Sequence, residues 1–335
     1  QRVMEIFHYF GAPDTVLYEA HAHIGSDKLP GIIKRMRECI LEHGGEIHFE
    51  TKVETLKSFK EPVILAIGHS AHDTYRMLAT EGVALETKGF AMGVRAEHPQ
   101  ALINKLMYHS ANVEYVGNAS YSLVTQVDGR GVYSFCMCPG GHIVPAGSTE
   151  GMCVVNGMSA SHRNSPYANS GMVVQINPED ISGDDPLRGL AFQEQLERLA
   201  FEQAYHIPLS AIAPAQRMRD FVESKASKDL PKCSYLPGIV PSRLDQWLPT
   251  HIGKRLQQGF RDFDKKYPGF LTNDAVIVGV ESRSSSPVRI IRDPESLESV
   301  STPGLYPCGE GAGYAGGITS SALDGINAAL KIAQQ

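Results

Sequence analysis

The clearest pattern in the chain is a helical spacing of apolar residues over residues 29–42. Charged residues lie between the apolar ones, which predicts an amphipathic helix. The apolar positions are Leu29, Ile32, Ile33, Met36, Ile40 and Leu41. Gly44 and Gly45 follow and are typical of a helix end. Residues 46–53 then alternate in character, so we expect a strand that completes one α/β unit.

The same α/β pattern continues over residues 62–80. An apolar run at 62–67 predicts a strand buried on both faces, and a helix is expected over about 71–79. Near the C-terminus, β-branched or apolar runs at 274–280 and 304–308 predict strands, and a terminal helix is expected over 320–333.

The middle of the chain, residues 89–270, has a different texture. It contains short alternating runs, many glycines and prolines, and one helical stretch over 192–205. We therefore expect an α/β fold in two parts. Residues 1–88 and 272–335 would form one discontinuous domain, and residues 89–271 an inserted, strand-rich α+β substrate domain.

Composition narrows the class of function. The 335 residues are 42% hydrophobic and 20% charged, as in ordinary globular proteins. No run approaches the ~20 apolar residues of a membrane helix, and the N-terminus lacks a secretion signal, so we expect a cytoplasmic protein without membrane attachment. A net charge of −6 argues against a nucleic-acid partner, including an RNA substrate. Six sparse cysteines indicate reduced thiols.

The most informative segment is residues 309–320, which read GEGAGYAGGITS between an expected strand and the terminal helix. Glycines let the backbone approach a ligand without a Cβ, and a helix N-terminus offers free N–H groups and a positive dipole end. The pyrimidine edge of a flavin gains negative charge on reduction and suits that position. A tight turn that serves packing alone is the alternative.

Three of these glycines, Gly311, Gly313 and Gly316, also spell the dinucleotide fingerprint G-x-G-x-x-G. Only 19 residues follow Gly316 (335 − 316 = 19), which leaves no room for a second strand and a ribose-binding carboxylate about 20 residues on. The segment is therefore expected to contact another part of a cofactor.

Segments over almost the whole chain carry a family resemblance. They are residues 23–29 (HIGSDKL), 65–71 (LAIGHSA), 93–99 (GVRAEHP), 133–141 (YSFCMCPGG), 156–159 (NGMS), 281–289 (ESRSSSPVR) and 309–325. With them the sequence resembles the FAD-dependent dehydrogenases of the glutathione-reductase-like flavoprotein superfamily, in an uncharacterised bacterial branch. The fold this implies is a glutathione-reductase-like FAD-binding domain with an inserted substrate domain.

The resemblance implies FAD as the cofactor. Val53 would lie near the adenine, Glu310 near the ribityl and phosphate portion, and residues 316–318 against the flavin ring. The full set of cofactor-binding residues that it implies is Gly25, Val53, Gly68, His69, Ser70, Gly309, Glu310, Gly316, Gly317 and Ile318. Family members also carry an N-terminal glycine-rich segment for the pyrophosphate, which is missing here, so we expect an FAD-binding domain that is incomplete at its N-terminus.

Four residues are candidates for catalysis. Arg95 and His98 flank Glu97, and a titratable histidine beside a carboxylate can relay protons during flavin reduction. A salt-bridged domain boundary is the alternative there. Arg283 stands with two further arginines in a serine-rich segment that can clamp an anionic substrate or the flavin, with a solvated loop as the alternative.

The fourth candidate is Cys136, which with Cys138 can form a redox pair beside the flavin. In a strand, residues two apart lie on one face, so buried packing is the alternative. The histidine pairs His21/His23 and His69/His72 lack a third ligand, so no metal is expected. Residues 68–70 (GHS) do not fit the nucleophile elbow of hydrolases.

The sequence thus predicts an FAD-dependent oxidoreductase that transfers a hydride between flavin and an unidentified small-molecule substrate. A nicotinamide or another electron donor or acceptor is a further possible partner. The alternative is a catalytically silent, FAD-free fragment that acts only as a folded domain.

Overall fold

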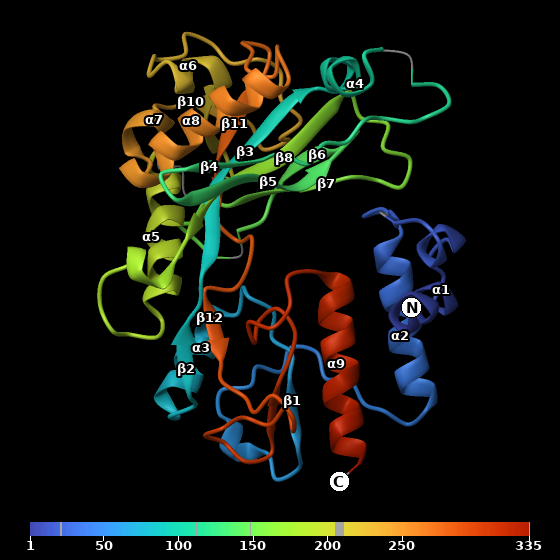
Figure 1. Cartoon of the computed structure of the whole chain (residues 1–335). Coiled ribbons are helices and arrows are strands. Elements are labelled where there is room, and N and C mark those ends of the chain that lie inside the picture. The colour runs from blue at the N-terminus through green and yellow to red at the C-terminus, as the bar shows by residue number, and fades with distance from the viewer. Residues whose placement is uncertain (21, 111–112, 148, 205–210, 335) are drawn as a thin grey trace. The chain divides into compact units, whose positions relative to one another are not determined.

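The computed structural model describes residues 1–334 except 21, 111–112, 148 and 205–210 (Figure 1). The chain divides into two compact units. Unit 1 comprises Gln1–Lys88, Ile181–Leu190 and Ser285–Gln335, and unit 2 comprises Gly89–Asp180 and Ala191–Ser284.

These units differ from the expected boundaries at two places. Residues 272–284, expected in the first domain, belong to unit 2, because the strand they contain pairs on both sides with strands of the unit 2 sheet. Residues 181–190, expected in the insert, belong to unit 1.

Unit 1 is built from helices and two small sheets. Its elements are α1 (Arg2–Tyr9), η1 (Asp14–Leu17), α2 (Leu29–Glu42), η2 (Leu56–Ser58), β1 (Val63–Leu65), α3 (His72–Thr80), β2 (Leu85–Thr87), β12 (Val288–Ile290), β13 (Leu305–Pro307) and α9 (Ile318–Ala333). Strands β2 and β12 pair antiparallel, whereas β1 and β13 pair parallel. Leu65, Leu78, Ile290 and Leu305 form a shared core.

The parallel pair of β1 and β13 positions the glycine-rich segment. Leu65 lies opposite Pro307, and the backbone N–H of Cys308 donates to the carbonyl of Leu65 at 3.0 Å. The loops after the two strands therefore leave the sheet side by side at the carboxyl ends, where open α/β sheets usually bind ligands.

Two expectations for unit 1 are wrong. Residues 46–53 form no strand, because they pair with no other segment of the described chain; Phe49 is 68% exposed. An alternating sequence pattern does not by itself supply the neighbouring strand with which the backbone N–H and C=O groups of a β-strand must pair. Strand β1 is also not buried on both faces, since Ile64 is 40% exposed while Leu65 is buried.

Unit 2 is dominated by one sheet. The strands of this sheet lie in the order β10-β9-β11-β3-β8-β5-β4. Their bounds are β3 (Phe90–Pro99), β4 (Val124–Val127), β5 (Arg130–Cys138), β8 (Tyr167–Ile176), β9 (Ala213–Arg217), β10 (Ile239–Pro241) and β11 (Val276–Glu281). Neighbours are antiparallel except β9 and β10. The remaining elements are α4 (Gln100–Tyr108), β6 (His142–Pro145), β7 (Val155–Met158), η3 (Pro178–Asp180), α5 (Arg188–Glu202), α6 (Met218–Val222), α7 (Leu244–Trp247) and α8 (Thr250–Lys266).

Both α8 and the hairpin of β6 and β7 cover this sheet. Helix α8 buries one stripe of residues, among them Leu256, Phe260 and Phe263. Gly259 lies on that stripe, where an added Cβ would stand 2.6 Å from a methyl group of Val132 on β5. The glycine lets the helix approach the strand closely, so this core requires a residue without a side chain there.

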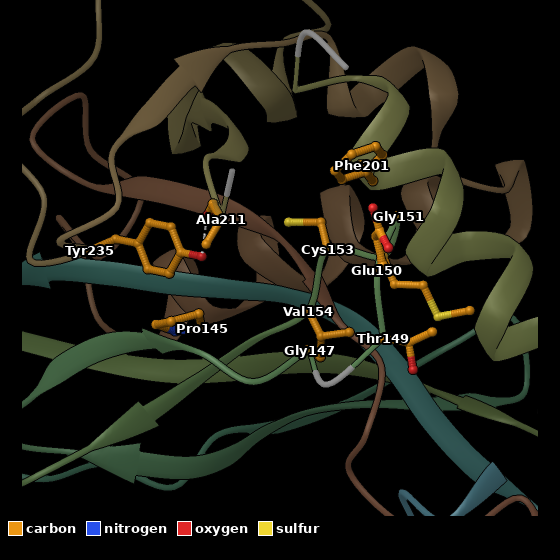
Figure 2. Close-up of a pocket in the computed structure, with 11 residues that line it drawn as sticks. Pro145, Gly147, Thr149, Glu150, Gly151, Cys153, Val154, Phe201, Ala211 and Tyr235 are labelled. Atoms are coloured by element: carbon orange, nitrogen blue, oxygen red, sulfur yellow. Dashed lines mark hydrogen bonds between the residues drawn. The ribbon is translucent and has the colours of Figure 1, made fainter. Parts of the chain in front are cut away.

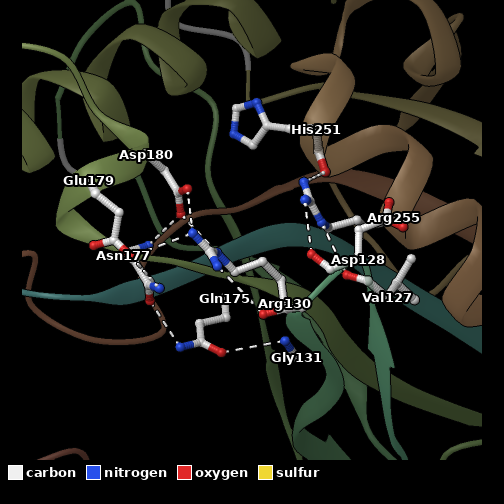
Figure 3. A network of polar contacts seen from close by, with 11 residues as sticks. Val127, Asp128, Arg130, Gly131, Gln175, Asn177, Glu179, Asp180, His251 and Arg255 are labelled. Carbon is white, nitrogen blue, oxygen red and sulfur yellow. Dashed lines mark hydrogen bonds and ion pairs between the residues drawn. The ribbon is translucent and has the colours of Figure 1, made fainter.

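A polar network fixes the end of the sheet where β4 turns into β5 (Figure 3). Asp128 and Gly129 both have positive φ, as a tight hairpin turn requires. Arg255 of α8 donates to the carbonyl of Val127 at 3.2 Å, and Arg130 forms an ion pair with Asp180 at 2.7 Å.

Candidate functional site

Residues 66–71 and 308–317, named here the paired loops, follow β1 and β13. They touch closely, because a Cβ on Gly311 would stand 2.4 Å from the carbonyl oxygen of Gly68. Tyr75 of α3 is fully buried beneath them, and its hydroxyl donates to the carbonyl of Gly311 at 2.7 Å. The same hydroxyl lies 3.0 Å from the hydroxyl of Ser286. Tyr75 therefore fixes the second loop against α3.

The glycines of the second loop fall into two groups. Gly309 and Gly313 have φ of +76° and +85°, and a Cβ on Gly313 would stand 2.8 Å from the carbonyl oxygen of Val288. With Gly311, these positions need glycine for packing or backbone conformation. Gly316 and Gly317 differ, since a Cβ on either would have no atom within 4 Å and Gly317 has an extended φ of −179°. Folding does not require glycine at those two positions.

Gly316 and Gly317 lead directly into α9, and Ile318 at its first position is 61% exposed. The first N–H groups of an α-helix have no partner within the helix and carry the positive end of its dipole. Ser320 turns back to this end, with its hydroxyl donating to the carbonyl of Gly317 at 3.0 Å. The result is bare backbone in front of a positive helix end.

A contact between a histidine and a carboxylate joins the paired loops. Nδ1 of His69 in the first loop lies 3.0 Å from a carboxylate oxygen of Glu310 in the second, and the two side chains are 16% and 25% exposed. The carboxylate accepts the Nδ1 proton, which leaves Nε2 as the other ring nitrogen. Nε2 is buried and has no hydrogen-bond partner within the described residues. A buried polar atom of this kind is normally paired with a water molecule, an ion or a ligand.

Cations also lie around the second loop. The guanidinium of Arg292 forms an ion pair with Asp324 at 2.7 Å and lies 3.8 Å from the ring centre of Tyr314. Asp324 in turn accepts the N–H of Gly309 at 2.8 Å, so Arg292 braces the loop. Burial lowers the pKa of Lys88, Arg289 lowers it further, and Glu310 opposes the shift. Lys88 and Glu310 therefore lie close enough to interact electrostatically.

Two residues implied by the resemblance lie elsewhere in unit 1. Gly25 precedes α2 with φ of +99°, and its carbonyl accepts the N–H of Lys28. Val53 is 42% exposed in the irregular segment 51–55. Within the described ranges, no recorded hydrogen bond links either residue to the paired loops, and their part in cofactor binding stays a prediction.

Unit 2 holds the four candidate catalytic residues, and Arg95 lies at its centre with no exposed surface. All five N–H donors of its guanidinium have acceptors. They are Asn169 Oδ1 at 2.9 Å, Glu281 Oε2 at 3.1 Å, Asn156 Oδ1 at 3.3 Å, Cys136 O at 2.6 Å and Cys138 Sγ at 3.4 Å. An arginine with no remaining donor is suited to holding the sheet to the β6–β7 hairpin.

His98 is equally enclosed. Its Nε2–H donates to the carbonyl of Phe270 at 2.9 Å, and the two rings lie 4.5 Å apart. Burial lowers the pKa of His98 to about 4, so the imidazole is neutral at pH 7. A neutral, fully buried imidazole suits packing better than proton relay. The proton-relay role of His98 stays a prediction.

Arg283 is 7% exposed and makes a two-pronged ion pair with Glu197 of α5, at 2.9 and 3.1 Å. The hydroxyl of Ser282 donates to the same carboxylate at 2.5 Å. This geometry differs from the solvated loop that was the alternative for Arg283, and it holds the arginine inside unit 2.

Cys136 and Cys138 do not share a strand face, because the β5–β8 register shifts between Phe135 and Cys138. Cys136 has a positive φ of +43° and an exposed side chain, whereas Cys138 packs against Arg95. Burial raises the pKa of the Cys138 thiol, and Arg95 opposes that shift. The bulge separates the two sulfur environments and turns one thiol outward.

Among the described residues, no three or more His, Cys, Asp or Glu side chains are grouped so as to hold a metal ion, and His21 lies outside the described residues. No helix of the described chain has both the length and the apolar character needed to cross a membrane.

Sequence reasoning did not single out Tyr75 or Asp324, because their roles depend on contacts with residues that are distant in sequence.

Comparison with known proteins finds a family that matches the part of the chain that contains unit 2. Residues 89–284 match the sequence model of a family described as "FAD-dependent protein, C-terminal domain-like". A protein from Clostridium beijerinckii, described as uncharacterized, is 44% identical over an alignment of 346 residues that covers 97% of this chain. The alignment spans 64% of that relative, so the chain corresponds to under two thirds of its length.

Proposed function

The chain belongs to the family of FAD-dependent proteins that share this C-terminal domain, and from that premise we propose that unit 1 binds FAD at the paired loops. We further propose a glutathione-reductase-like FAD-binding fold for unit 1 and an oxidoreductase activity on a small-molecule substrate. The bound cofactor would supply a two-electron acceptor for hydride transfer.

The observation that carries the proposal is the bare backbone at Gly316 and Gly317. Packing and conformation explain the glycines at 309, 311 and 313 but not these two, which face open space directly before α9. A flat heterocycle that collects negative charge on reduction would gain from both features, because backbone N–H groups and the helix dipole stabilise that charge.

The orphaned nitrogen of His69 also fits a flavin nucleotide. Glu310 holds Nδ1, which leaves Nε2 as the ring nitrogen that a ligand can contact. The hydroxyl groups of a ribityl chain can each donate or accept a hydrogen bond at that position. In its protonated form, Lys88 would favour the reduced, anionic form of the ring.

Among the four candidate catalytic residues, exposure separates Cys136 from the others. Arg95 and His98 are fully buried and Arg283 nearly so, whereas the side chain of Cys136 is exposed. We propose that the three buried residues maintain the C-terminal domain and that Cys136 is the one available to a substrate. A nicotinamide or another small molecule would be the second redox partner.

Retention of FAD tests the proposal. The purified chain is incubated with FAD and gel-filtered, and bound flavin is measured by absorbance near ~450 nm and by mass spectrometry. Gly317→Val should keep the fold, because its Cβ has space, yet lower FAD affinity. A clash of about 1–3 kcal/mol corresponds to roughly 5- to 150-fold in Kd.

Gly325→Val is the matched control. It places the same side chain in the same helix, two turns further on, and its Cβ also meets no atom within 4 Å. Equal FAD affinity in parent, G317V and G325V would remove the paired loops as the site. A folded parent that retains no FAD would support the alternative, a catalytically silent domain.

A further inference from the structure

Unit 2 contains a cavity of about 280 Å³ beside the loop that joins β6 to β7 (Figure 2). This volume lies just below the range of roughly 300–1,000 Å³ for pockets that hold drug-sized ligands, so a small ligand is expected. The described residues that line it are Pro145, Gly147, Thr149, Glu150, Gly151, Met152, Cys153, Val154, Phe201, Ala211 and Tyr235. None of them belongs to the paired loops of unit 1.

Core residues build two walls of the cavity. Tyr235 is 4% exposed, and its hydroxyl donates to the carbonyl of Ala211 at 2.5 Å. Cys153 is 5% exposed; its backbone N–H donates to the carbonyl of Glu197 on α5 at 3.0 Å, and its thiol points to the carbonyl of Gly279 at 3.7 Å. These contacts fix the walls to the sheet and to α5, so the hollow does not depend on surface side chains alone.

The described lining of the cavity combines a negative charge with aromatic rings. Glu150 is the one charged side chain among the described lining residues, and it is negative. Figure 2 shows Phe201 and Tyr235 on different sides of the cavity with Cys153 between them. Burial raises the pKa of Cys153 to about 12, so its thiol is neutral at pH 7. A carboxylate with two aromatic rings attracts a cation, both by charge and through the ring quadrupoles.

We propose that this cavity binds a small organic cation, a protonated amine with an apolar or aromatic body. The ammonium group would pair with Glu150, and the body would lie against Phe201, Tyr235 and Val154. The carboxylate of Glu150 would repel an anion, so an anion should bind less tightly than a cation of the same shape. The proposal concerns unit 2 alone and does not rest on FAD binding.

Three probes of similar shape separate charge from size. Benzylammonium, benzyl alcohol and benzoate are titrated into the full chain at pH 7 and low salt, by calorimetry. Benzylammonium should bind at least about five-fold more tightly than benzyl alcohol, as one partly exposed ion pair and a cation–π contact allow. Benzoate should bind most weakly, and raising the salt to 0.5 M should narrow the differences. Benzoate binding as tightly as benzylammonium would overturn the proposal.

Variants then locate the binding site. Glu150→Gln should lower benzylammonium affinity to that of benzyl alcohol and leave the alcohol unchanged. Glu202→Gln is the matched control, because Glu202 is exposed at the end of α5 and does not line the cavity. Phe201→Leu should weaken both ligands. Glu150 is itself exposed, so E150Q should fold even where F201L does not. Unchanged benzylammonium affinity in E150Q would refute the cavity as its site.

Discussion

In unit 1, Gly316 and Gly317 face open space, whereas in unit 2 a Cβ on Gly157 would stand 2.0 Å from an Nη atom of Arg95. The same residue type therefore satisfies two different demands. Gly157 makes room for a buried side chain that is present in the fold. Gly316 and Gly317 leave room that no part of the described chain fills.

The charged groups repeat this contrast. Arg95 and Glu281 are 0% and 1% exposed, and every donor of the arginine is used. His69 and Glu310 are partly exposed, and one ring nitrogen of the histidine is unpaired within the described residues. The complete hydrogen bonding of Arg95 indicates a structural role, whereas the unpaired ring nitrogen of His69, in a partly exposed loop, leaves a contact for a water molecule or a ligand.

The largest effect should follow from Arg95→Met, which leaves the Glu281 carboxylate buried without its cation. We expect a loss of about 3–5 kcal/mol in the free energy of unfolding of unit 2. This loss can be measured by urea unfolding, followed by the fluorescence of Trp247. Trp247 is the single tryptophan of the chain and belongs to unit 2. Arg130→Met is the control, because its ion pair with Asp180 is partly exposed and worth at most about 1 kcal/mol. Equal losses in the two variants would contradict the assigned role of Arg95.

Gly157→Ala tests the glycine itself. The new Cβ would collide with Arg95 and stand 2.2 Å from Oδ1 of Asn169, so both partners must shift. We expect a destabilisation of about 1–3 kcal/mol, again read from Trp247 in urea. A change below about 0.5 kcal/mol would mean that the guanidinium of Arg95 can move aside freely, which would contradict its tight packing against Gly157.

How far such contacts could be foreseen depends on their sequence separation. The spacing of Leu29, Ile32 and Met36 correctly predicted α2, because a helix bonds only within itself. The terminal helix and β1 were also found, to within two residues. The strand predicted at residues 46–53 is wrong, because strand pairing depends on a second segment that the local sequence pattern does not reveal.

The same limit applies to the candidate sites. The glycine density at 309–317 drew attention to the second loop, but only the folded structure separates glycines that are needed for packing from glycines that are not. Arg95 was noted for its neighbours in sequence, yet its partners Asn169 and Glu281 lie 74 and 186 residues away. The outward turn of Cys136 depends on a bulge, which the C-x-C spacing does not encode.

His98 gives a pH-dependent test of the enclosed unit. Its pKa is about 4 in the fold against 6.5 in the unfolded chain, so the fold favours the neutral ring. This stabilisation is complete above pH 6.5 and is lost as the pH falls toward 4, because the unfolded state binds the proton first. From pH 7.5 to 5.5 the parent should lose about 1.4 kcal/mol more than His98→Gln, in urea unfolding at each pH. Parallel pH profiles for the two proteins would show that His98 is protonated without cost.

The smallest effect on stability should come from Gly317→Ala. Its methyl group meets no atom within 4 Å and φ is extended, so the free energy of unfolding should change by less than about 0.5 kcal/mol. FAD affinity should nevertheless fall from parent to G317A to G317V, because each added methyl fills more of the space that the ligand needs. A graded loss of binding at constant stability would separate this glycine from Gly157, where stability itself changes. If affinity stays level across the series while the fold holds, the open backbone before α9 does not contact the cofactor.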